Sequence, residues 1–340
     1  MDQFKSCNTG LSPRNWLTMS RRNFLASLSA SLSLLPAALA HAESDIPTSR
    51  NIKWACSEAT WGYYPPEAFT DILDVMKDTG FYGIRITGFP ASLQRYGVTQ
   101  AQMQSEVSKR GLQVVTISWN GQLQDPAARQ KVLDSARDAM KFLADFGANH
   151  LVVFSPNRTA PGANTPAGFK ELCERCNQIG EIAGGMGFTA GLHNHMNSMV
   201  QTQEELDRFM AMTDPKLFGL SPDTCHLNLG GCNVVATFEK YKDRIHFMDY
   251  KDSKWVTPTQ DWVEATGKVI PKDSEQARFL FSSVDLGDGE VDFPGCHRIL
   301  KSMNYRGWIC VDLDGTRFGP FADLHRSGAY IVKNLEPIYL

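Results

Sequence analysis

The sequence predicts a single (β/α)8 barrel, in which eight parallel strands form a closed sheet surrounded by helices. Short β-branched or apolar runs alternate eight times with stretches of helical periodicity, which is the pattern of a parallel sheet with crossover helices. Most of the helical stretches begin with recognisable cap residues. The chain of 340 residues exceeds the roughly 250 residues that such a barrel needs. Its composition, 42% hydrophobic and 21% charged, is that of a globular protein with a full core.

The strands and helices can be placed in order along the chain. Strands are expected at 52–56, 83–86, 113–118, 150–154, 189–193, 218–222, 245–250 and 307–311. Helices are expected at 66–79, 100–110, 125–146, from 165 onward, from 202 onward, and at 233–241, 292–303 and 321–335. Thr165 and Pro166 form an N-cap followed by a first-turn proline, and Thr202 and Glu205 form a capping box. The segment 252–285 is too long for a simple connection, so we expect it to form a lid or rim over the site.

The N-terminal segment resembles a twin-arginine export signal. Arg21 and Arg22 precede an apolar, small-residue run, and an A-x-A cleavage site ends at Ala42. A membrane anchor is the alternative, but the run at 24–40 is serine-rich and short for a span of about 20 residues. We therefore expect a signal peptide over 1–42, one barrel domain over 43–340 and passage through the twin-arginine export machinery. The mature protein would be periplasmic or otherwise exported, with no stable membrane anchor.

Charge and cysteine content narrow the classes of partner. The 34 basic and 37 acidic residues give a formal net charge of −3, so no basic field is present to hold nucleic acid. A small-molecule ligand is expected instead, and a homo-oligomer is compatible with the sequence. Seven cysteines remain after residue 42, an odd number without a disulfide framework. Cys173 and Cys176 form a C-x-x-C, which suggests redox or zinc chemistry, but helical spacing favours a place on a buried helix face.

Histidine and aspartate side chains gather where four consecutive strands end. These strand ends carry His193-Asn194-His195, Asp223-Thr224-Cys225-His226, Asp249-Tyr250-Lys251-Asp252 and Asp312-Leu313-Asp314, and His246 lies on the third of these strands. The carboxyl ends of barrel strands carry the chemistry. Side chains of these types at one height predict an open divalent-metal site. The alternative for each aspartate is a helix cap or a loop anchor, a role that suits Asp252 and Asp314.

These motifs resemble the xylose-isomerase-like barrel family of sugar isomerases and epimerases, with the inosose dehydratases as the most similar members. Besides the strand ends, 200–210 and the run 287–293, G-D-G-E-V-D-F, are similar to the family's patterns. The family commonly uses Glu, Asp, His and Glu as metal ligands. The resemblance places His193, Asp223, Asp249 and Asp312 at these positions, so the ligand types differ. It implies manganese, cobalt or magnesium, with zinc as a further option.

The resemblance also implies the chemistry. A bound metal would polarise a carbonyl, so that a side chain can remove the neighbouring proton. We expect His195 and His226 to act as base, acid or substrate-holding groups and Lys251 to stabilise the enolate oxygen. Substrate-binding roles are assigned to Arg85 at the end of the second strand, to Trp119 and to His246. Core or rim packing is the alternative for Trp119.

Three functions follow from the sequence. The first is a metal-dependent isomerase, epimerase or dehydratase acting on a keto-sugar or an inosose. The second is an exported barrel that binds sugar without catalysis, which the exchanged ligand types motivate. The third is an endonuclease-type phosphodiesterase, since a DNA-repair endonuclease shares the barrel, but the acidic balance and the export signal disfavour it.

Overall fold

The computed structural model describes residues 52–61, 69–264 and 267–339, and every structural statement below refers to these residues. The expected signal peptide over 1–42 and the first residues of the helix expected at 66–79 lie outside them. Among the described residues, no helix is both long and apolar enough to span a bilayer.

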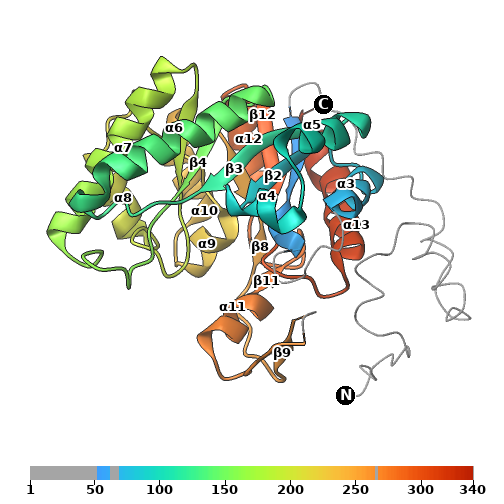
Figure 1. Cartoon of the computed structure of the whole chain (residues 1–340). Coiled ribbons are helices and arrows are strands. Elements are labelled where there is room, and N and C mark those ends of the chain that lie inside the picture. The colour runs from blue at the N-terminus through green and yellow to red at the C-terminus, as the bar shows by residue number, and fades with distance from the viewer. Residues whose placement is uncertain (1–51, 62–68, 265–266, 340) are drawn as a thin grey trace, which may run out of the picture.

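Eight parallel strands form the barrel, which confirms the predicted fold class (Figure 1). They are β1 (Ile52–Ser57), β2 (Gly83–Thr87), β3 (Gln113–Trp119), β4 (His150–Phe154), β5 (Thr189–His193), β6 (Gly219–Leu220), β7 (Met248–Tyr250) and β12 (Gly307–Val311). The hydrogen-bonded order is β6-β5-β4-β3-β2-β1-β12-β7. The two outer members, β6 and β7, meet through single parallel bridges from Leu220 to Ile245 and from Asp223 to Asp249. These bridges nearly close the sheet on itself.

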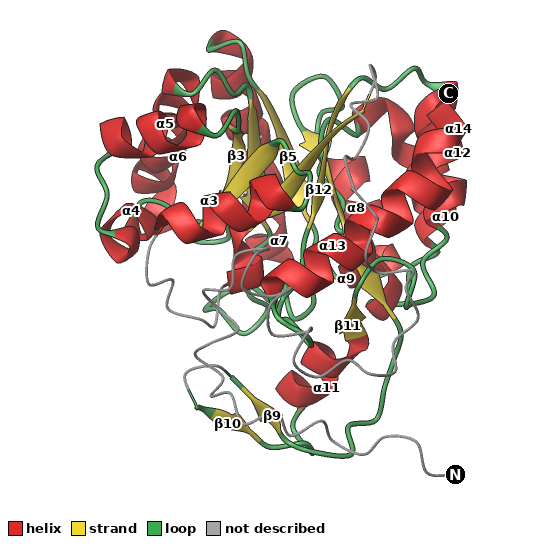
Figure 2. Ribbon diagram, turned by 90° about the vertical axis from the view of Figure 1, so that its right-hand side faces the viewer, coloured by secondary structure: helices red, strands yellow, loops and turns green. Residues whose placement is uncertain are grey.

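Helices surround the sheet on its outer face (Figure 2). They are α3 (Phe69–Asp78), α4 (Ala91–Tyr96), α5 (Gln100–Lys109), α6 (Arg129–Asp145), α7 (Pro166–Gly185), α8 (Gln203–Met212), α9 (Thr224–Leu229), α10 (Val234–Tyr241), α12 (Phe293–Ser302), α13 (Pro320–Tyr330) and α14 (Glu336–Tyr339). Short 3-10 turns lie at η2 (Glu58–Trp61), η3 (Pro126–Ala128) and η4 (Lys242–Arg244), and a π-helical turn at η5 (Ile331–Leu335). The short helices α4 and α9 were not expected from the sequence.

Local sequence explains where the main helices begin. The Thr165 hydroxyl accepts a hydrogen bond from the Gly168 amide, with Pro166 in the first turn of α7. The Thr202 side chain and Glu205 cap one another's backbone at the start of α8, which confirms the predicted capping box. Such caps satisfy amide groups that have no partner inside the helix.

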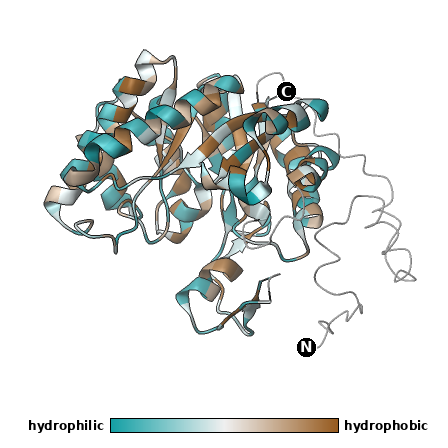
Figure 3. Cartoon of the chain, viewed as in Figure 1, coloured by the Kyte–Doolittle hydropathy of each residue, from teal (hydrophilic) through white to brown (hydrophobic). Residues whose placement is uncertain are grey.

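Side chains alternate between the inside and the outside of the barrel. Outward-facing residues such as Trp54, Ile84 and Ile309 join the large core shared with the helices, and Figure 3 shows apolar residues concentrated on the elements' inner faces. Inside the barrel, a small apolar cluster consists of Ala55, Val115, Val152, Phe247 and Cys310. The next inward-facing positions on β1, β7 and β12 are the polar residues Ser57, Asp249 and Asp312, whereas on β4 the next position is Phe154. The barrel interior therefore has an apolar layer beneath a charged one.

The segment 252–285 is built from small elements that project from the barrel (Figures 1 and 2). The strands β8 (Asp252–Ser253) and β11 (Ser283–Val284) pair antiparallel, as do β9 (Trp262–Val263) and β10 (Val269–Ile270). The helix α11 (Glu275–Ser282) follows β10. Trp262, Ile270, Ala277 and Leu280 form a separate apolar cluster within this segment. This cluster gives α11 a fixed place next to the barrel strands that carry the candidate site.

Candidate active site

Side chains along a strand point alternately to its two faces, and this alternation turns a set of polar side chains at the strand ends into the barrel. Ser57 pairs with Arg85 in the register of β1 and β2, and Cys310 pairs with Asp249 in that of β12 and β7. Lys251 and Asp312 follow two residues after Asp249 and Cys310, so they face the same side. All of these charged side chains are buried. The inward-facing carboxyl ends of β2, β7 and β12 therefore form one charged layer.

Arg85 holds two carboxylates together. Its guanidinium lies 2.8 Å from Asp249 Oδ2 and 2.9 Å from Asp312 Oδ1, and it donates to Ser57 Oγ at 3.0 Å. The Arg85 side chain is 1% exposed. The guanidinium thus holds Asp249 and Asp312 together, and the substrate-binding role of Arg85 stays a prediction.

Lys251 is the second buried cation of the site. Its ammonium lies 3.0 Å from Asp223 Oδ2, 2.9 Å from Asp312 Oδ2 and 2.7 Å from Asp314 Oδ2. His226 Nε2 is 3.2 Å from the same nitrogen. Of these carboxylates, Asp314 is the most accessible, with 18% of its side chain exposed. Lys251 therefore joins the ends of β6, β7 and β12.

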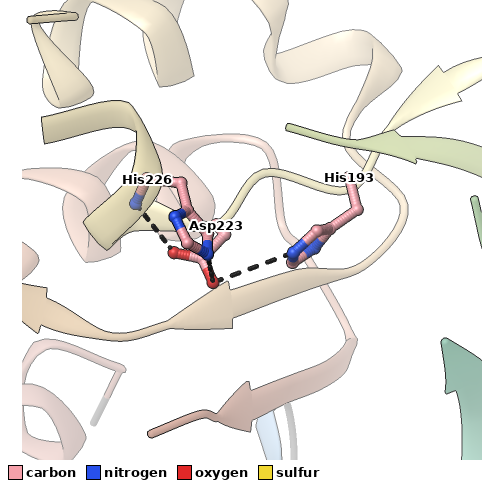
Figure 4. Close-up of side chains that lie close together, drawn as sticks. All are labelled: His193, Asp223 and His226. Carbon is pink, nitrogen blue, oxygen red and sulfur yellow. Dashed lines mark hydrogen bonds and ion pairs between the residues drawn. The ribbon is translucent and has the colours of Figure 1, made fainter. Parts of the chain in front are cut away.

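Asp223 connects two histidines. Its Oδ1 accepts a hydrogen bond from the His226 amide and caps α9, so the cap alternative that we weighed for strand-end aspartates applies to it. Its Oδ2 lies 3.9 Å from His193 Nε2 and 3.9 Å from His226 Nε2. Figure 4 shows the two rings on opposite sides of this carboxylate. His193 Nδ1 is 3.1 Å from Asp249 Oδ2, so the imidazole lies between the two carboxylates.

His195 lies at the accessible side of this group. Its Nδ1 donates to the Met196 carbonyl at 2.7 Å, so Nε2 carries the lone pair. Its ring lies 3.8 Å from the His226 ring, measured between centroids. Phe279 of α11 stacks on His226 at 5.4 Å, with 6° between the ring planes. The segment 252–285 thus contributes one aromatic side chain to the site, whereas its role as a lid stays a prediction.

The carboxyl groups of this layer have very different proton affinities. Burial raises the pKa of Asp249 to about 7, against the opposing effect of Arg85. Burial likewise raises the pKa of Asp223 to about 6, opposed by Lys251 and His193. Burial acts on Asp312 in the same direction, but Arg85 and Lys251 together hold its pKa well below the usual value. Asp312 is therefore the fixed anion between the two cations.

At neutral pH Lys251 is protonated and the three imidazoles of the site are neutral. Burial disfavours the charge on Lys251, but Asp223, Asp312 and Asp314 outweigh it and raise its pKa. Burial lowers the pKa of His193, His195 and His226, so that all three rings are neutral at neutral pH. A neutral imidazole can accept a proton, which suits His195 for base chemistry.

Metal ligation can be tested on this geometry. Two groups of ligand-type atoms lie within 4.8 Å of one another: His193, Asp223 and His226, and His195, His226 and Asp314. Lys251 contacts two members of each group. The predicted ligands Asp249 and Asp312 are both paired with Arg85. In this arrangement protein cations already pair with the three carboxylates of the predicted set of four ligands, so a divalent ion would have to displace Lys251 or Arg85 to bind them.

Two predicted substrate-binding residues lie elsewhere. Trp119 ends β3 but faces outward, where its Nε1 donates to Ser135 of α6 at 3.1 Å. His246 precedes β7, and its ring lies 6.4 Å from that of His150, the first residue of β4. His246 is therefore at the amino-terminal end of the barrel. Sequence reasoning missed the contact of Phe279 with the site and the ion pair of Asp314, which we had interpreted as a cap or loop anchor.

Comparison with known proteins agrees with the fold. Residues 73–333 match the family of xylose isomerase-like TIM barrels, so the chain belongs to this family. Inosose dehydratase from Lactiplantibacillus plantarum is 27% identical over 315 residues, which cover 84% of this chain and 97% of that protein.

Solved structures of two epimerases share the fold. A 3-keto-D-glucoside 4-epimerase from E. coli is 17% identical with a TM-score of 0.60, over 83% of this chain and 99% of the epimerase. An L-ribulose 3-epimerase is 16% identical with a TM-score of 0.63, over 84% of this chain and 95% of the epimerase.

Proposed function

We propose that this protein is a carbohydrate isomerase, epimerase or dehydratase that removes a proton next to a carbonyl of a keto-sugar or an inosose. The observation that carries the proposal is the place of His195, a neutral ring with its lone pair on Nε2, in one group with His226 and Asp314, of which Asp314 pairs with the ammonium of Lys251. The similarity to inosose dehydratase supports the substrate class.

In this reaction His195 removes the proton and the enolate charge develops on the carbonyl oxygen. Lys251 stabilises that charge from a site shielded from water, where a fixed positive charge has a large effect. Asp314 is the accessible partner of Lys251, so the carbonyl oxygen approaches from this side. Return of the proton to the opposite face gives epimerisation. Its return to the former carbonyl carbon, while the neighbouring hydroxyl loses its proton and becomes the new carbonyl, gives isomerisation. Loss of a β-hydroxyl as water, after a proton has been added to it, gives dehydration.

A divalent metal ion, whether manganese, cobalt, magnesium or zinc, is the sequence-based expectation for polarising the carbonyl. The carboxylates expected to hold the ion, those of Asp223, Asp249 and Asp312, already pair with Arg85 or Lys251. Export through the twin-arginine route would place the activity in the periplasm, and it remains a proposal from the N-terminal sequence alone.

The test is proton exchange in heavy water. Inososes, keto-sugars and 3-keto-glucosides would be incubated with the protein, and loss of the proton next to the carbonyl would be followed by NMR. His195→Gln is expected to lower the exchange rate by about a hundredfold or more, because general base catalysis contributes roughly that much. His325→Gln on the outer helix α13 is the matched control and should exchange at the wild-type rate. Sugar binding without exchange in the wild-type protein would instead support a non-catalytic sugar-binding barrel.

A further inference from the structure

The Lys251 ammonium lies at the point where the ligand-type side chains of the barrel converge. It is within 3.2 Å of His226 Nε2 and within 3.0 Å of the Oδ2 atoms of Asp223, Asp312 and Asp314. The Lys251 side chain is 1% exposed, so water does not screen these contacts.

A divalent ion held by the same atoms would collide with this ammonium. A metal ion bound to Asp223 Oδ2 and His226 Nε2 at the usual ~2.1 Å lies close to the line between these atoms, which are 3.9 Å apart. Lys251 Nζ is 3.0 Å from the first atom and 3.2 Å from the second. The ion would then lie no more than about 3.2 Å from Nζ. Two cations at that separation in a buried site repel each other strongly.

The remaining carboxylates are paired in the same way. Asp249 and Asp312 lie 2.8 Å and 2.9 Å from the Arg85 guanidinium. Each of the three carboxylates expected to bind a metal ion therefore has a protein cation within 3.0 Å. Buried anions need such compensation, and here two side chains supply it.

We propose that the Lys251 ammonium takes the place of the divalent cation in this barrel, and that the protein is stable and active without a bound metal ion. The proposal of activity rests on the proposed function, whereas the proposal about the cation does not. Arg85 supplies the second positive charge, because its guanidinium pairs with Asp249 and Asp312. The electrophile would then be a fixed part of the chain, and the N–H group that binds the partly exposed Asp314 would turn to donate to an enolate oxygen.

The decisive experiment compares metal binding by the wild-type protein and by Lys251→Met. Both proteins would be dialysed against EDTA, and the melting temperature and metal content would then be measured with manganese, cobalt or zinc chloride added. Removing the ammonium leaves Asp223 and Asp314 without this cation and Asp312 with Arg85 alone, while His193 and His226 stay near Asp223. We expect Lys251→Met to bind about one metal ion per chain and to melt about 5 °C higher with metal present.

The wild-type protein should show neither effect. Lys254→Met is the matched control, since Lys254 lies three residues away and donates to the Asp288 carbonyl outside the site. It should behave as the wild type does. If Lys251→Met does not fold, Lys251→Gln replaces it, and the wild-type measurement is interpreted on its own.

Several results would overturn the proposal. One stoichiometric metal ion in the wild-type protein that resists EDTA, or a wild-type melting temperature that rises with added metal, would show that Lys251 and a metal coexist. A folded Lys251 variant that gains no metal would show that Nζ does not occupy a metal position. None of these readouts needs a substrate, so absence of proton exchange would refute the proposed function without touching this assignment.

Discussion

Replacing Arg85 by methionine tests whether the guanidinium holds the charged layer together. Methionine keeps much of the side-chain length but leaves Asp249 and Asp312 without the partner that lies 2.8 Å and 2.9 Å away. Asp312 keeps Lys251, whereas Asp249 loses its only contact with a Lys or Arg within the described residues.

The expected loss of stability is large because the pair is buried. Breaking a buried ion pair by removing one partner costs about 3 to 5 kcal/mol, since the remaining charge is left in a medium of low polarity. Burial already raises the pKa of Asp249 to about 7, and the positive charge of Arg85 keeps it from rising further. The variant should therefore take up a proton at Asp249, and its loss of stability should be smaller at pH 6 than at pH 8.

Urea denaturation followed by circular dichroism at both pH values would measure this loss. Arg137→Met is the control, because Arg137 forms an exposed ion pair with Asp134 and is expected to change stability by less than about 1 kcal/mol. Asp249→Asn combined with Arg85→Met should recover part of the loss at pH 8. A loss below about 1 kcal/mol for Arg85→Met at pH 8 would refute the reasoning that the guanidinium is needed to bury these carboxylates.

Three further predictions follow from single contacts. Phe279→Leu removes the ring that stacks on His226. Since stacking of this kind contributes about 0.5 to 1.5 kcal/mol, kcat/KM in the exchange assay should fall up to about tenfold. An unchanged kcat/KM would exclude a role for this contact. His150 is buried, and its Nε2 shares a hydrogen bond of 2.8 Å with Ser221 Oγ. Burial lowers the pKa of His150 to about 3. Its native ring stays neutral while the unfolded ring takes up a proton below about pH 6.5, so stability falls with decreasing pH, by about 2 to 3 kcal/mol at pH 4.5. His150→Gln should lose this part of the pH dependence in urea titrations at pH 7 and 4.5, and an identical slope in both proteins would contradict it. Thr202→Ala removes the cap of α8 and should cost about 1 kcal/mol in the same assay, whereas no change would mean that the cap is dispensable.

Local patterns predicted the strands well, because a strand and its following helix each leave a short-range signature. The strands at the site are shorter than expected: β6 covers Gly219–Leu220 rather than 218–222, and β7 covers Met248–Tyr250 rather than 245–250. Asp223 ends this strand region and at once caps α9, a six-residue helix whose apolar pattern is too short to recognise.

The orientation of Trp119 shows what the sequence pattern could not reveal. Ile84 pairs with Val114 and Arg85 with Thr116, so the register skips Val115. Val115 belongs to the cluster inside the barrel, and simple alternation from it would turn Trp119 inward as well. The bulge shifts the period by one residue and directs Trp119 towards α6.

The pairing of charges was equally hidden. Arg85 and Asp249 are 164 positions apart, and no periodicity joins them. The sequence predicted that the charged residues at the strand ends lie together, because parallel strands end at the same face. It did not show which carboxylates Arg85 and Lys251 would neutralise, since that depends on the stagger of neighbouring strands around the barrel.

The bridge between Asp223 and Asp249, where the last two strands meet, has a consequence for how the chain folds. A half-built sheet would expose both carboxylates to water, and the cations that bind them come from β2 and from the end of β7. Sequestering these charges is favourable only once all of the strands have assembled, because an unpaired buried charge costs several kcal/mol. Partly assembled intermediates that bury this region would thus be destabilised, and closure of the ring and assembly of the charged layer would occur as one cooperative event.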